Sequence, residues 1–562
     1  MLNNQTEAAE IYAMITNLVS LGERMSAAAR RGNRAEVAQR GRYMGQALQA
    51  LRSVSGRIDQ EQPQITLNNF CRTAECSLLR VLTFRRDYPM KCEFELLPVL
   101  QELRMYFYYW GCVSPDKKKM KQYRKKELQE LAANRYIDRA EQCGQYKYDL
   151  TIIIQGYNHL EDATKQCLKS LFEHLPGKLK YELILVNNGS SDGTKEFFER
   201  FHPTKQFDPA VNYGGQLALY RIYEGKYILF ISNDVFVLHH SIRNMLRCVN
   251  SNPDISFLVP QTPNISNLQV LGITCDCSCF SAAVEQYALT NNRYDPRRHI
   301  QRARLCNPLS IQRAVDFFSS QGVLYSGIFY ADKPGLSFPD DAMSILINRR
   351  GGKNVLQKDA FCYHMGQLTI KDDVAKAGES QFYNEGRRAF YKEFGVDPWG
   401  TGFCFDPNLI QALGFFKKSH INILGINSGL GDNPLQVKEC YKEYLGIRDV
   451  TLYCTYWNRA AGQSMAGIAD IHKTVSTARQ LRNVFPGVQF DHIIMEEAFP
   501  DGSDAVPLIS ILQQRLTLEG TFVLKLDSSA LDAAQKRYPQ AKFCPGNDGI
   551  WMIGGANTSG AV

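Results

Sequence analysis

Three carboxylates and one histidine stand where they could do chemistry. Asp234 directly follows an apolar run, and Asp340 and Asp341 form an acidic pair. Carboxylate oxygen is the ligand that Mg²⁺ and Mn²⁺ prefer, and a carboxylate can also take a proton as a general base. His364 could join such a site, because a neutral imidazole accepts a divalent ion. Each has a plainer interpretation: Asp234 as a helix cap, the acidic pair as the first turn of a helix, and His364 as a hydrogen-bonded side chain.

Two buried strands must position a ligand near these side chains. The first, 150–154, runs into Gln155-Gly156-Tyr157-Asn158, and the second, 183–186, runs into Asn187-Asn188-Gly189-Ser190. Their continuous apolar runs are typical of parallel strands buried on both faces. In open α/β sheets, ligands bind outside the carboxyl ends of the strands. The strand, helix and strand between Tyr148 and Thr194 therefore predict a nucleotide site.

Taken in order, these elements resemble a family 2 glycosyltransferase of the GT-A fold. Residues 151–158 resemble its T-I-I-I-x-x-Y-N strand end, 186–194 its V-x-N-G-S-x-D-G-T loop, and 212–214 its N-x-G loop. Strand 227–231 ends in Ser232-Asn233-Asp234-Val235, which resembles a D-x-D triad of which only Asp234 remains. Residues 338–352 resemble E-D-x-D-L-x-x-R-x-R-R-x-G, and 359–366 resemble P-D-A-x-x-x-H-x-G. The resemblance spans about residues 148–394, under half of the chain.

The resemblance implies an inverting, metal-dependent transfer of a sugar, of hexosyltransferase type, from a nucleotide-sugar to a hydroxyl of a glycan or glycoconjugate. By its register Asp341 holds the position of the catalytic base, with Asp340 as its acidic neighbour. It makes Asp234 and His364 ligands of Mn²⁺ or Mg²⁺. A UDP- or dTDP-linked donor is expected, although asparagines replace the acid usual in the second loop. The residues expected to bind the nucleotide-sugar are Gln155, Gly156, Tyr157, Asn158, Asn187, Asn188, Gly189, Ser190, Asn212, Gly214 and Asn233.

The fold class expected for the chain is α/β, with three domains, because 562 residues are too many for one core. Helix-spaced apolar residues predict a helical accessory domain over 1–146. Residues 147–395 form the predicted GT-A nucleotide-sugar domain. A turn-rich linker covers 396–419, and a Rossmann-like α/β domain covers 420–562.

The C-terminal region resembles a Rossmann-type methyltransferase whose cofactor site has degenerated. Residues 423–431 lie where such enzymes have L-D-x-G-x-G-x-G, but Gly425 replaces the acid and Asn427 a glycine. Strand 450–453 ends in Cys454-Thr455 instead of the acid that would hold a ribose. Asp470 or Glu496 could take over that contact. A scaffold or acceptor-binding role is the alternative.

Net charge and cysteine content limit the kinds of partner and the cellular location that we expect. The net charge of +8 is mild for this length, and no nucleic-acid-binding motif accompanies the basic run 117–126, so nucleic acid is not expected. Without a signal peptide or an apolar run of ~20 residues, the 16 cysteines predict a reduced, cytoplasmic protein. The aromatic run 105–110 could contact the inner face of the membrane peripherally, or pack against the next domain. An oligomer is left open.

Two further hypotheses come from the residues that depart from the family patterns. The thinned metal triad and the paired asparagines would also suit a non-catalytic module that binds sugar-nucleotides or serves in assembly. If the C-terminal region still held S-adenosylmethionine, the chain would instead be a bifunctional glycosyltransferase and methyltransferase.

Overall fold

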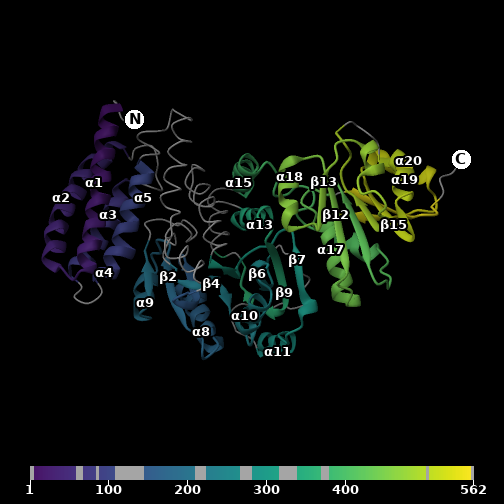
Figure 1. Ribbon diagram of the computed structural model, residues 1–562. Coiled ribbons are helices and arrows are strands. Elements are labelled where there is room, and N and C mark those ends of the chain that lie inside the picture. The colour runs from purple at the N-terminus through teal and green to yellow at the C-terminus, as the bar shows by residue number, and fades with distance from the viewer. Residues whose placement is uncertain are drawn as a thin grey trace.

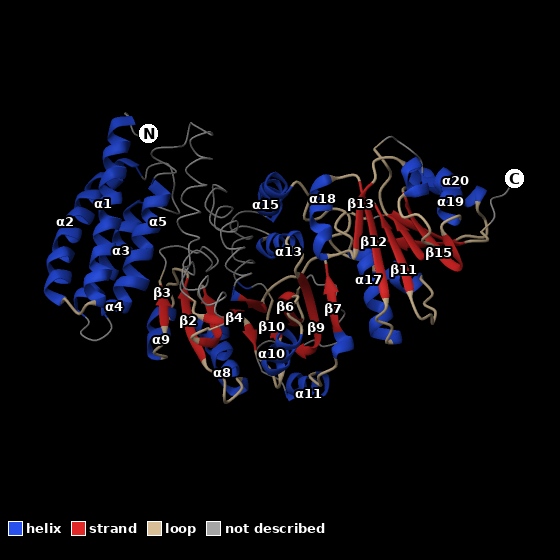
Figure 2. Cartoon of the chain, in the orientation of Figure 1, coloured by secondary structure: helices blue, strands red, loops and turns tan. Residues whose placement is uncertain are grey.

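The chain is a mixed α/β structure with a helical N-terminal part (Figures 1 and 2). The computed structural model describes residues 5–58, 67–83, 88–107, 145–208, 223–265, 282–314, 338–366, 368, 379–500, 505–547 and 549–558. Its described strands form one sheet of eight strands, one of seven and a short two-stranded pair. No helix within these ranges is both long enough and apolar enough to cross a membrane.

The N-terminal helices pack around a core of their own at one end of the molecule (Figure 1). Ile15, Leu18, Met44 and Leu48 recur at helix spacing and are fully or almost fully buried, so the apolar stripe of each helix faces its neighbours. Arg80 of the third helix forms an ion pair with Glu199 of the next region. The helices are α1 (Gln5–Arg30), α2 (Arg34–Ile58), α3 (Leu67–Thr83), α4 (Tyr88–Lys91) and α5 (Leu97–Phe107).

The eight-stranded sheet has the order β3-β2-β1-β4-β8-β6-β9-β7. Strands β3, β2, β1 and β4 are parallel neighbours, as their continuous apolar runs predict, and β6 pairs in parallel with β9. Strands β8 and β7 run antiparallel to their neighbours. The strands are β1 (Tyr148–Gly156), β2 (Tyr181–Asn187), β3 (Lys205–Phe207), β4 (Gly225–Ser232), β6 (Ile255–Gln261), β7 (His299–Arg302), β8 (Leu309–Arg313) and β9 (Lys353–Phe361).

Helices cover both faces of this sheet (Figure 2). Alternate strand residues, such as Leu258 and Val259 of β6, belong to different core clusters, which is the mark of a strand buried on both sides. One face carries α8 (Lys165–His174), α10 (Ser241–Ser251) and α11 (Ala282–Asn291), and the other carries α13 (Pro339–Arg349). Further elements are α9 (Thr194–Arg200), α15 (Glu379–Phe394) and the antiparallel pair β5 (Val235–Phe236) and β10 (Tyr363–His364).

The seven-stranded sheet has the order β13-β12-β11-β14-β15-β17-β16. Its first five strands are parallel, and β17 runs antiparallel to both β15 and β16. The strands are β11 (Ile421–Ile426), β12 (Val450–Tyr456), β13 (Ile471–Thr474), β14 (Phe490–Met495), β15 (Leu516–Leu526), β16 (Lys542–Gly546) and β17 (Gly549–Gly555). The helices are α16 (Pro407–Ala412), α17 (Asp432–Cys440), α18 (Arg459–Ser464), α19 (Ala505–Gln513) and α20 (Ser528–Arg537).

The two large sheets share one continuous hydrophobic core. Leu305 and Ile345 from the first region pack in the same cluster as Ile423 and Leu435 from the second. The segment 396–419, expected as a linker, contributes Phe403, Leu409 and Leu413 to that cluster and contains α16. The region carrying α13 is therefore stabilised by packing against the C-terminal region.

A close approach of backbones at this seam gives a first prediction. Gly467 is buried, and a Cβ added there would lie 2.5 Å from Gly352 O and 2.7 Å from Asn348 Cα. We expect Gly467→Ala to lower the free energy of unfolding by about 1–3 kcal/mol, because neither backbone can move without disturbing the shared core. Urea denaturation measures the change. Gly414→Ala is the matched control, since nothing lies within 4 Å of its added Cβ. Equal stability of the two variants would contradict a tight seam.

Candidate functional site

The predicted nucleotide loops meet at one edge of the first sheet. Strand β1 lies between β2 and β4, with Gly156 opposite Asn187 and Gln155 opposite Ser232. Beyond the strands, Asn188 N donates to Gly156 O at 2.9 Å and Asn233 N donates to Gln155 O at 3.1 Å. The polar residues that follow three separate strands therefore lie side by side.

Much of the predicted binding set holds the loops together. Asn158 has a left-handed backbone (φ 56°), donates its N–H to Ser190 Oγ at 2.8 Å and accepts from Ser191 N through Oδ1 at 3.0 Å. The Asn233 amide donates to Asn158 O at 3.1 Å and to Thr164 Oγ1 at 2.7 Å. The hydrogen bonds of these two side chains go to neighbouring loop and helix atoms, so they hold the loops of the site in place.

The second loop is fixed in the same way. Asn187 accepts from Ser190 N at 3.0 Å and donates to the buried carboxylate of Asp208 at 3.1 Å, and Gly189 takes a left-handed φ of 76°. Asp192 accepts from Leu160 N at 2.8 Å and so ties this loop to the one after β1. Neither Asp192 nor Asp208 is among the predicted site residues. The aspartate of the G-S-x-D pattern was a usable signal for Asp192, whereas nothing marked Asp208.

The other predicted residues of the loops carry less information. Gly156 is buried against the ring of Phe198, which would lie 3.3 Å from an added Cβ. Tyr157 is half-buried beside it. Asn212 and Gly214 lie outside the described residues.

The two predicted metal ligands come together. Strand β10 pairs with β5, which sets His364 opposite Val235, and His364 Nε2 lies 3.2 Å from Asp234 Oδ2. Across the described ranges, no group of three or more His, Cys, Asp and Glu side chains is arranged to hold a metal ion. Two protein ligands still fit a cation that takes its other ligands from substrate phosphates and water, which is how Mg²⁺ is usually held.

Several buried polar atoms at this edge have no hydrogen-bond partner among the described residues. Buried polar groups are normally paired, so unpaired groups gathered at one edge indicate that a polar ligand completes them. All follow or lie next to the ends of parallel strands or the acidic pair. They are Gln155 Oε1, Asn188 Oδ1, Gln261 Oε1, Thr262 Oγ1, Asn307 Oδ1 and His364 Nδ1.

The acidic pair begins α13, and its two members differ in their contacts. Asp341 is 3% exposed and forms an ion pair with Arg304 Nε. Asp340 is half-buried and accepts from Asn307 N at 3.0 Å. Burial raises the pKa of Asp340 to about 6, the hydrogen bond from Asn307 N and the charge of Arg304 act to lower it, and the charge of Asp341 acts to raise it.

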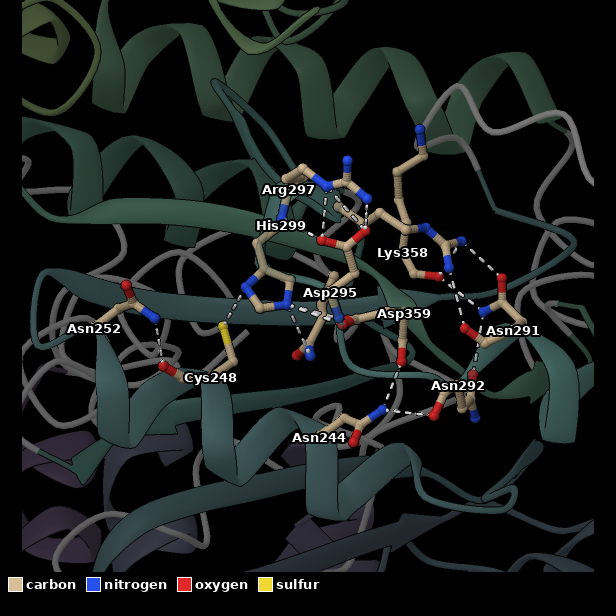
Figure 3. Close-up of polar contacts among 12 residues, drawn as sticks. Asn244, Cys248, Asn252, Asn291, Asn292, Asp295, Arg297, His299, Lys358 and Asp359 are labelled. Carbon is tan, nitrogen blue, oxygen red and sulfur yellow. Dashed lines mark hydrogen bonds and ion pairs between the residues drawn. The ribbon is translucent and has the colours of Figure 1, made fainter. Parts of the chain in front are cut away.

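A second polar cluster contains the residue types of a nucleophilic triad (Figure 3). His299 lies between Cys248 and Asp359, with Nδ1 3.3 Å from Cys248 Sγ and Nε2 3.2 Å from both carboxylate oxygens of Asp359. Cys248 is 0% exposed, and burial raises the pKa of its thiol to about 12. A buried thiol that stays protonated is no nucleophile, so this cluster holds α10, β7 and β9 together.

The glycine loop of the second sheet is covered by the chain itself. Leu430 N donates to Thr401 O at 3.3 Å and Asp432 N donates to Gly402 O at 3.1 Å. A Cβ on Gly402 or Gly429 would lie 2.0 Å or 1.8 Å from the facing backbone oxygen. Amides at the start of α17, which a nucleotide phosphate would otherwise use, are thus already paired.

The two acids considered as substitutes in this sheet lie at opposite ends of it. Asp470 accepts from Leu452 N at 2.7 Å near the amino end of β12, away from the strand ends where ligands bind. Glu496 follows β14 at the carboxyl end and accepts from Asn433 Nδ2 at 2.9 Å. Of the two, only Glu496 lies at the carboxyl edge of the sheet, and it is buried there.

Residues 151–270 match the model of the family described as Glycosyl transferase family 2. The matched stretch contains most of β1, all of β2 and β4, the loops that follow these strands, and Asp234. The match supports a family 2 glycosyltransferase and, with it, glycosyl transfer as the class of activity.

Individual relatives match only parts of the chain. Glycosyltransferase AglE of Haloferax volcanii is 42% identical over 52 residues, which are 9% of this chain and 17% of that protein. The mannosyltransferase PcManGT of Pyrobaculum calidifontis, solved with GDP-Man and Mn²⁺, has a TM-score of 0.31 at 11% identity, covering 49% of this chain and 74% of that one. GalNAc-T7, solved with UDP, GalNAc and Mn²⁺, has a TM-score of 0.29 at 11% identity, covering 39% and 44%. These scores are too low to carry over any property of the two enzymes.

Glu496 gives a prediction about stability and pH. Burial raises its pKa from 4.5 to about 7, so the folded chain keeps the proton over a range in which the unfolded chain loses it. The free energy of unfolding therefore falls as pH rises from about 4.5 to about 7. We expect Glu496→Gln, which keeps an acceptor for Asn433, to be more stable than wild type by about 1–3 kcal/mol at pH 8 and equal to it at pH 4. Urea midpoints at the two pH values measure this, and a variant no more stable at pH 8 would contradict it.

Proposed function

We propose that this chain is an inverting, metal-dependent glycosyltransferase that moves a hexose from a UDP- or dTDP-linked donor to a hydroxyl of a glycan or glycoconjugate. The observation that carries the proposal is the meeting of Asp234 and His364 beside the strand ends of the region that matches family 2. The unpartnered polar atoms along the same edge support a polar ligand there.

Donor binding is assigned to the carboxyl edge of β1, β2 and β4. Within the described ranges, Gln155 Oε1 and Asn188 Oδ1 have no hydrogen-bond donor, and a base imide or a ribose hydroxyl would supply one. Asp234 and His364 would hold Mn²⁺ or Mg²⁺, which when bound neutralises the pyrophosphate and the charge that grows on the leaving nucleotide. Asn158, Asn187 and Asn233 act by keeping the loops in place.

The acidic pair is the proposed source of the general base. An acceptor hydroxyl loses its proton on the face of the sugar opposite the leaving group, and a carboxylate can receive it. Family register favours Asp341, but that carboxylate is paired with Arg304. Asp340 is more exposed, and among the described residues its carboxylate accepts from Asn307 N instead of pairing with a cation. We therefore propose Asp340 as the base and Asp341 as the anchor of Arg304.

The C-terminal region is proposed as a Rossmann-like scaffold within the layout 1–146, 147–395, 396–419 and 420–562. Its strand order β13-β12-β11-β14-β15 matches the 3-2-1-4-5 part of the doubly wound arrangement, which supports the resemblance. Because residues 401 and 402 pair with the amides of the glycine loop, we propose that it no longer holds S-adenosylmethionine. The described cysteines are free thiols, which supports a cytoplasmic location; peripheral contact with the inner membrane face stays a proposal.

The alternative class is a module that binds sugar-nucleotides without turning them over. It would keep Mn²⁺-dependent affinity for a donor yet release no nucleoside diphosphate. A panel of UDP- and dTDP-hexoses, assayed for diphosphate release with Mn²⁺ and after chelation, separates the two classes.

Asp234 is the first residue to test. We expect Asp234→Ala to lose Mn²⁺-dependent binding of UDP and dTDP, because the remaining His364 supplies only one ligand to the cation. Calorimetry with each nucleotide, with and without Mn²⁺, measures the loss, and thermal melting checks the fold. Asp532→Ala is the matched control on the exposed side of α20. Unchanged nucleotide affinity in the Asp234 variant would remove this residue from the site.

The acidic pair is tested by comparing two isosteric variants. Asp340→Asn should keep donor affinity and lower turnover by a factor on the order of 10² to 10⁴, the usual worth of a general base. Asp341→Asn should act more weakly on turnover and more strongly on stability, because it leaves Arg304 without its carboxylate. Steady-state kinetics and thermal melting of both proteins measure the difference. The reverse order of turnover would assign the base to Asp341.

A further inference from the structure

Strand β7 is an edge strand whose outer side needs partners. It ends the eight-stranded sheet and pairs with β9 on one side only. In an antiparallel edge strand, every second residue turns its N–H and C=O away from the sheet, and buried backbone groups must be paired. Residues 299, 301 and 303 are the outward residues here.

One side of a C-terminal helix supplies those partners in place of a further strand. Glu439 accepts from Gln301 N at 3.0 Å, and Asp432 accepts from Ala303 N at 2.8 Å. Lys442, two residues beyond the end of α17, donates to His299 O at 2.6 Å. Between them Gln436 accepts from the Arg302 guanidinium at 2.5 Å. The spacing 432, 436, 439, 442 lies along one face of a helix, and α17 runs beside β7 (Figure 1).

The residues that follow β7 bind the helix of the acidic pair. Ala303 O accepts from Asn348 Nδ2 at 2.8 Å, and Leu305 N donates to Ser344 Oγ at 3.2 Å. Arg304 pairs with Asp341, and Asn307 N donates to Asp340 at 3.0 Å. Segment 301–307 is thus held by α17 at its start and holds α13 along the rest of its length.

We propose that Asp432 and Glu439 of the C-terminal region are positioning residues for the acidic pair, acting through segment 301–307. The inference rests on the proposed function. It gives the C-terminal region a role in the transfer step that does not depend on any cofactor bound at its glycine loop. Neither residue touches the donor site, because their contacts lie on the outer edge of β7, at the far end of the sheet order from β1 and β2.

Two consequences separate positioning from general stability. Loosening segment 301–307 disturbs Arg304 and α13, so turnover falls while donor affinity, set at the ends of β1, β2 and β4, is kept. A substitution that removes comparable buried hydrogen bonds elsewhere in the C-terminal region lowers the stability of the fold but not turnover. Asp491 offers this comparison: it is 0% exposed and accepts from Asn422 N at 2.9 Å, from Lys418 and from Thr517, and no contact joins it to segment 301–307.

The experiment compares Asp432→Asn with Asp491→Asn in the full chain. Asparagine keeps one acceptor oxygen, so in the first variant either Ala303 N or Phe405 N loses its partner. We expect both variants to melt below wild type, and only Asp432→Asn to lower kcat at least tenfold, with the KM for UDP- and dTDP-hexoses and Mn²⁺ changed less than twofold. Glu439→Gln should give a milder fall in kcat, because its amide still has an oxygen for Gln301 N.

Hydrogen exchange of backbone amides gives a readout independent of turnover. Asp432→Asn should speed exchange in 301–307 and in α13, and Asp491→Asn should not. If exchange behaves so but wild type releases no diphosphate from any donor, the positioning contact stands and the proposed function fails. If wild type is active and the two variants have equal kcat, or equal exchange in α13, the positioning inference is overturned while the proposed function stands.

Discussion

Among the described residues, polar atoms without a hydrogen-bond partner are buried along one edge of the eight-stranded sheet, and they set the constraint on which the rest of the structure depends. Each buried polar group without a partner costs free energy. An edge with several such groups must therefore be stabilised by other hydrogen bonds. The asparagine network supplies these bonds: Asn158 and Asn233 bind the first loop to the strand ends on either side. The loops are thereby fixed before a ligand arrives, and little ordering remains to be done on binding.

The cost of burying an unpaired polar group also explains why the adjacent carboxylates of Asp340 and Asp341 can differ in role. Asp341 is buried beside Arg304, and an ion pair removed from water is stabilising only when its geometry is held firmly. That firmness comes from segment 301–307, which is bound on both sides by helices distant in sequence. A rigid Arg304 then fixes the charge that neighbours Asp340, and the pKa of Asp340 follows from burial opposed by this charge.

Sequence patterns predicted the strands that carry the candidate site but only part of what their residues do. The apolar runs at 150–154, 183–186 and 227–231 coincide with β1, β2 and β4, since burial on both faces leaves a strong signal. Family register also predicted that Asp234 and His364 belong together, and they lie in contact. The amides of Asn158 and Asn233 were expected to face the donor, whereas their partners are other loop atoms. Arg304 and Asp432 carried no signal, because each is paired with a residue distant in sequence: Arg304 with Asp341, and Asp432 with Ala303, more than a hundred residues away.

The glycine-rich loop after β11 allows a close backbone contact within the chain. Glycine after the first strand of a doubly wound sheet normally lets a pyrophosphate approach the backbone. Here the same absence of a side chain lets residues 401 and 402 approach the loop, and Gly402 and Gly429 each face a backbone oxygen at a distance no Cβ could share. The backbone N–H groups of Leu430 and Asp432 therefore donate to the carbonyl oxygens of residues 401 and 402. These bonds fix the start of α17 against the segment that follows the first region. A helix anchored in this way at its amino end can present Asp432 and Glu439 to β7 without moving. Asp432, the first residue of α17, joins the two sets of contacts, because its N–H donates to Gly402 O while its carboxylate accepts from Ala303 N.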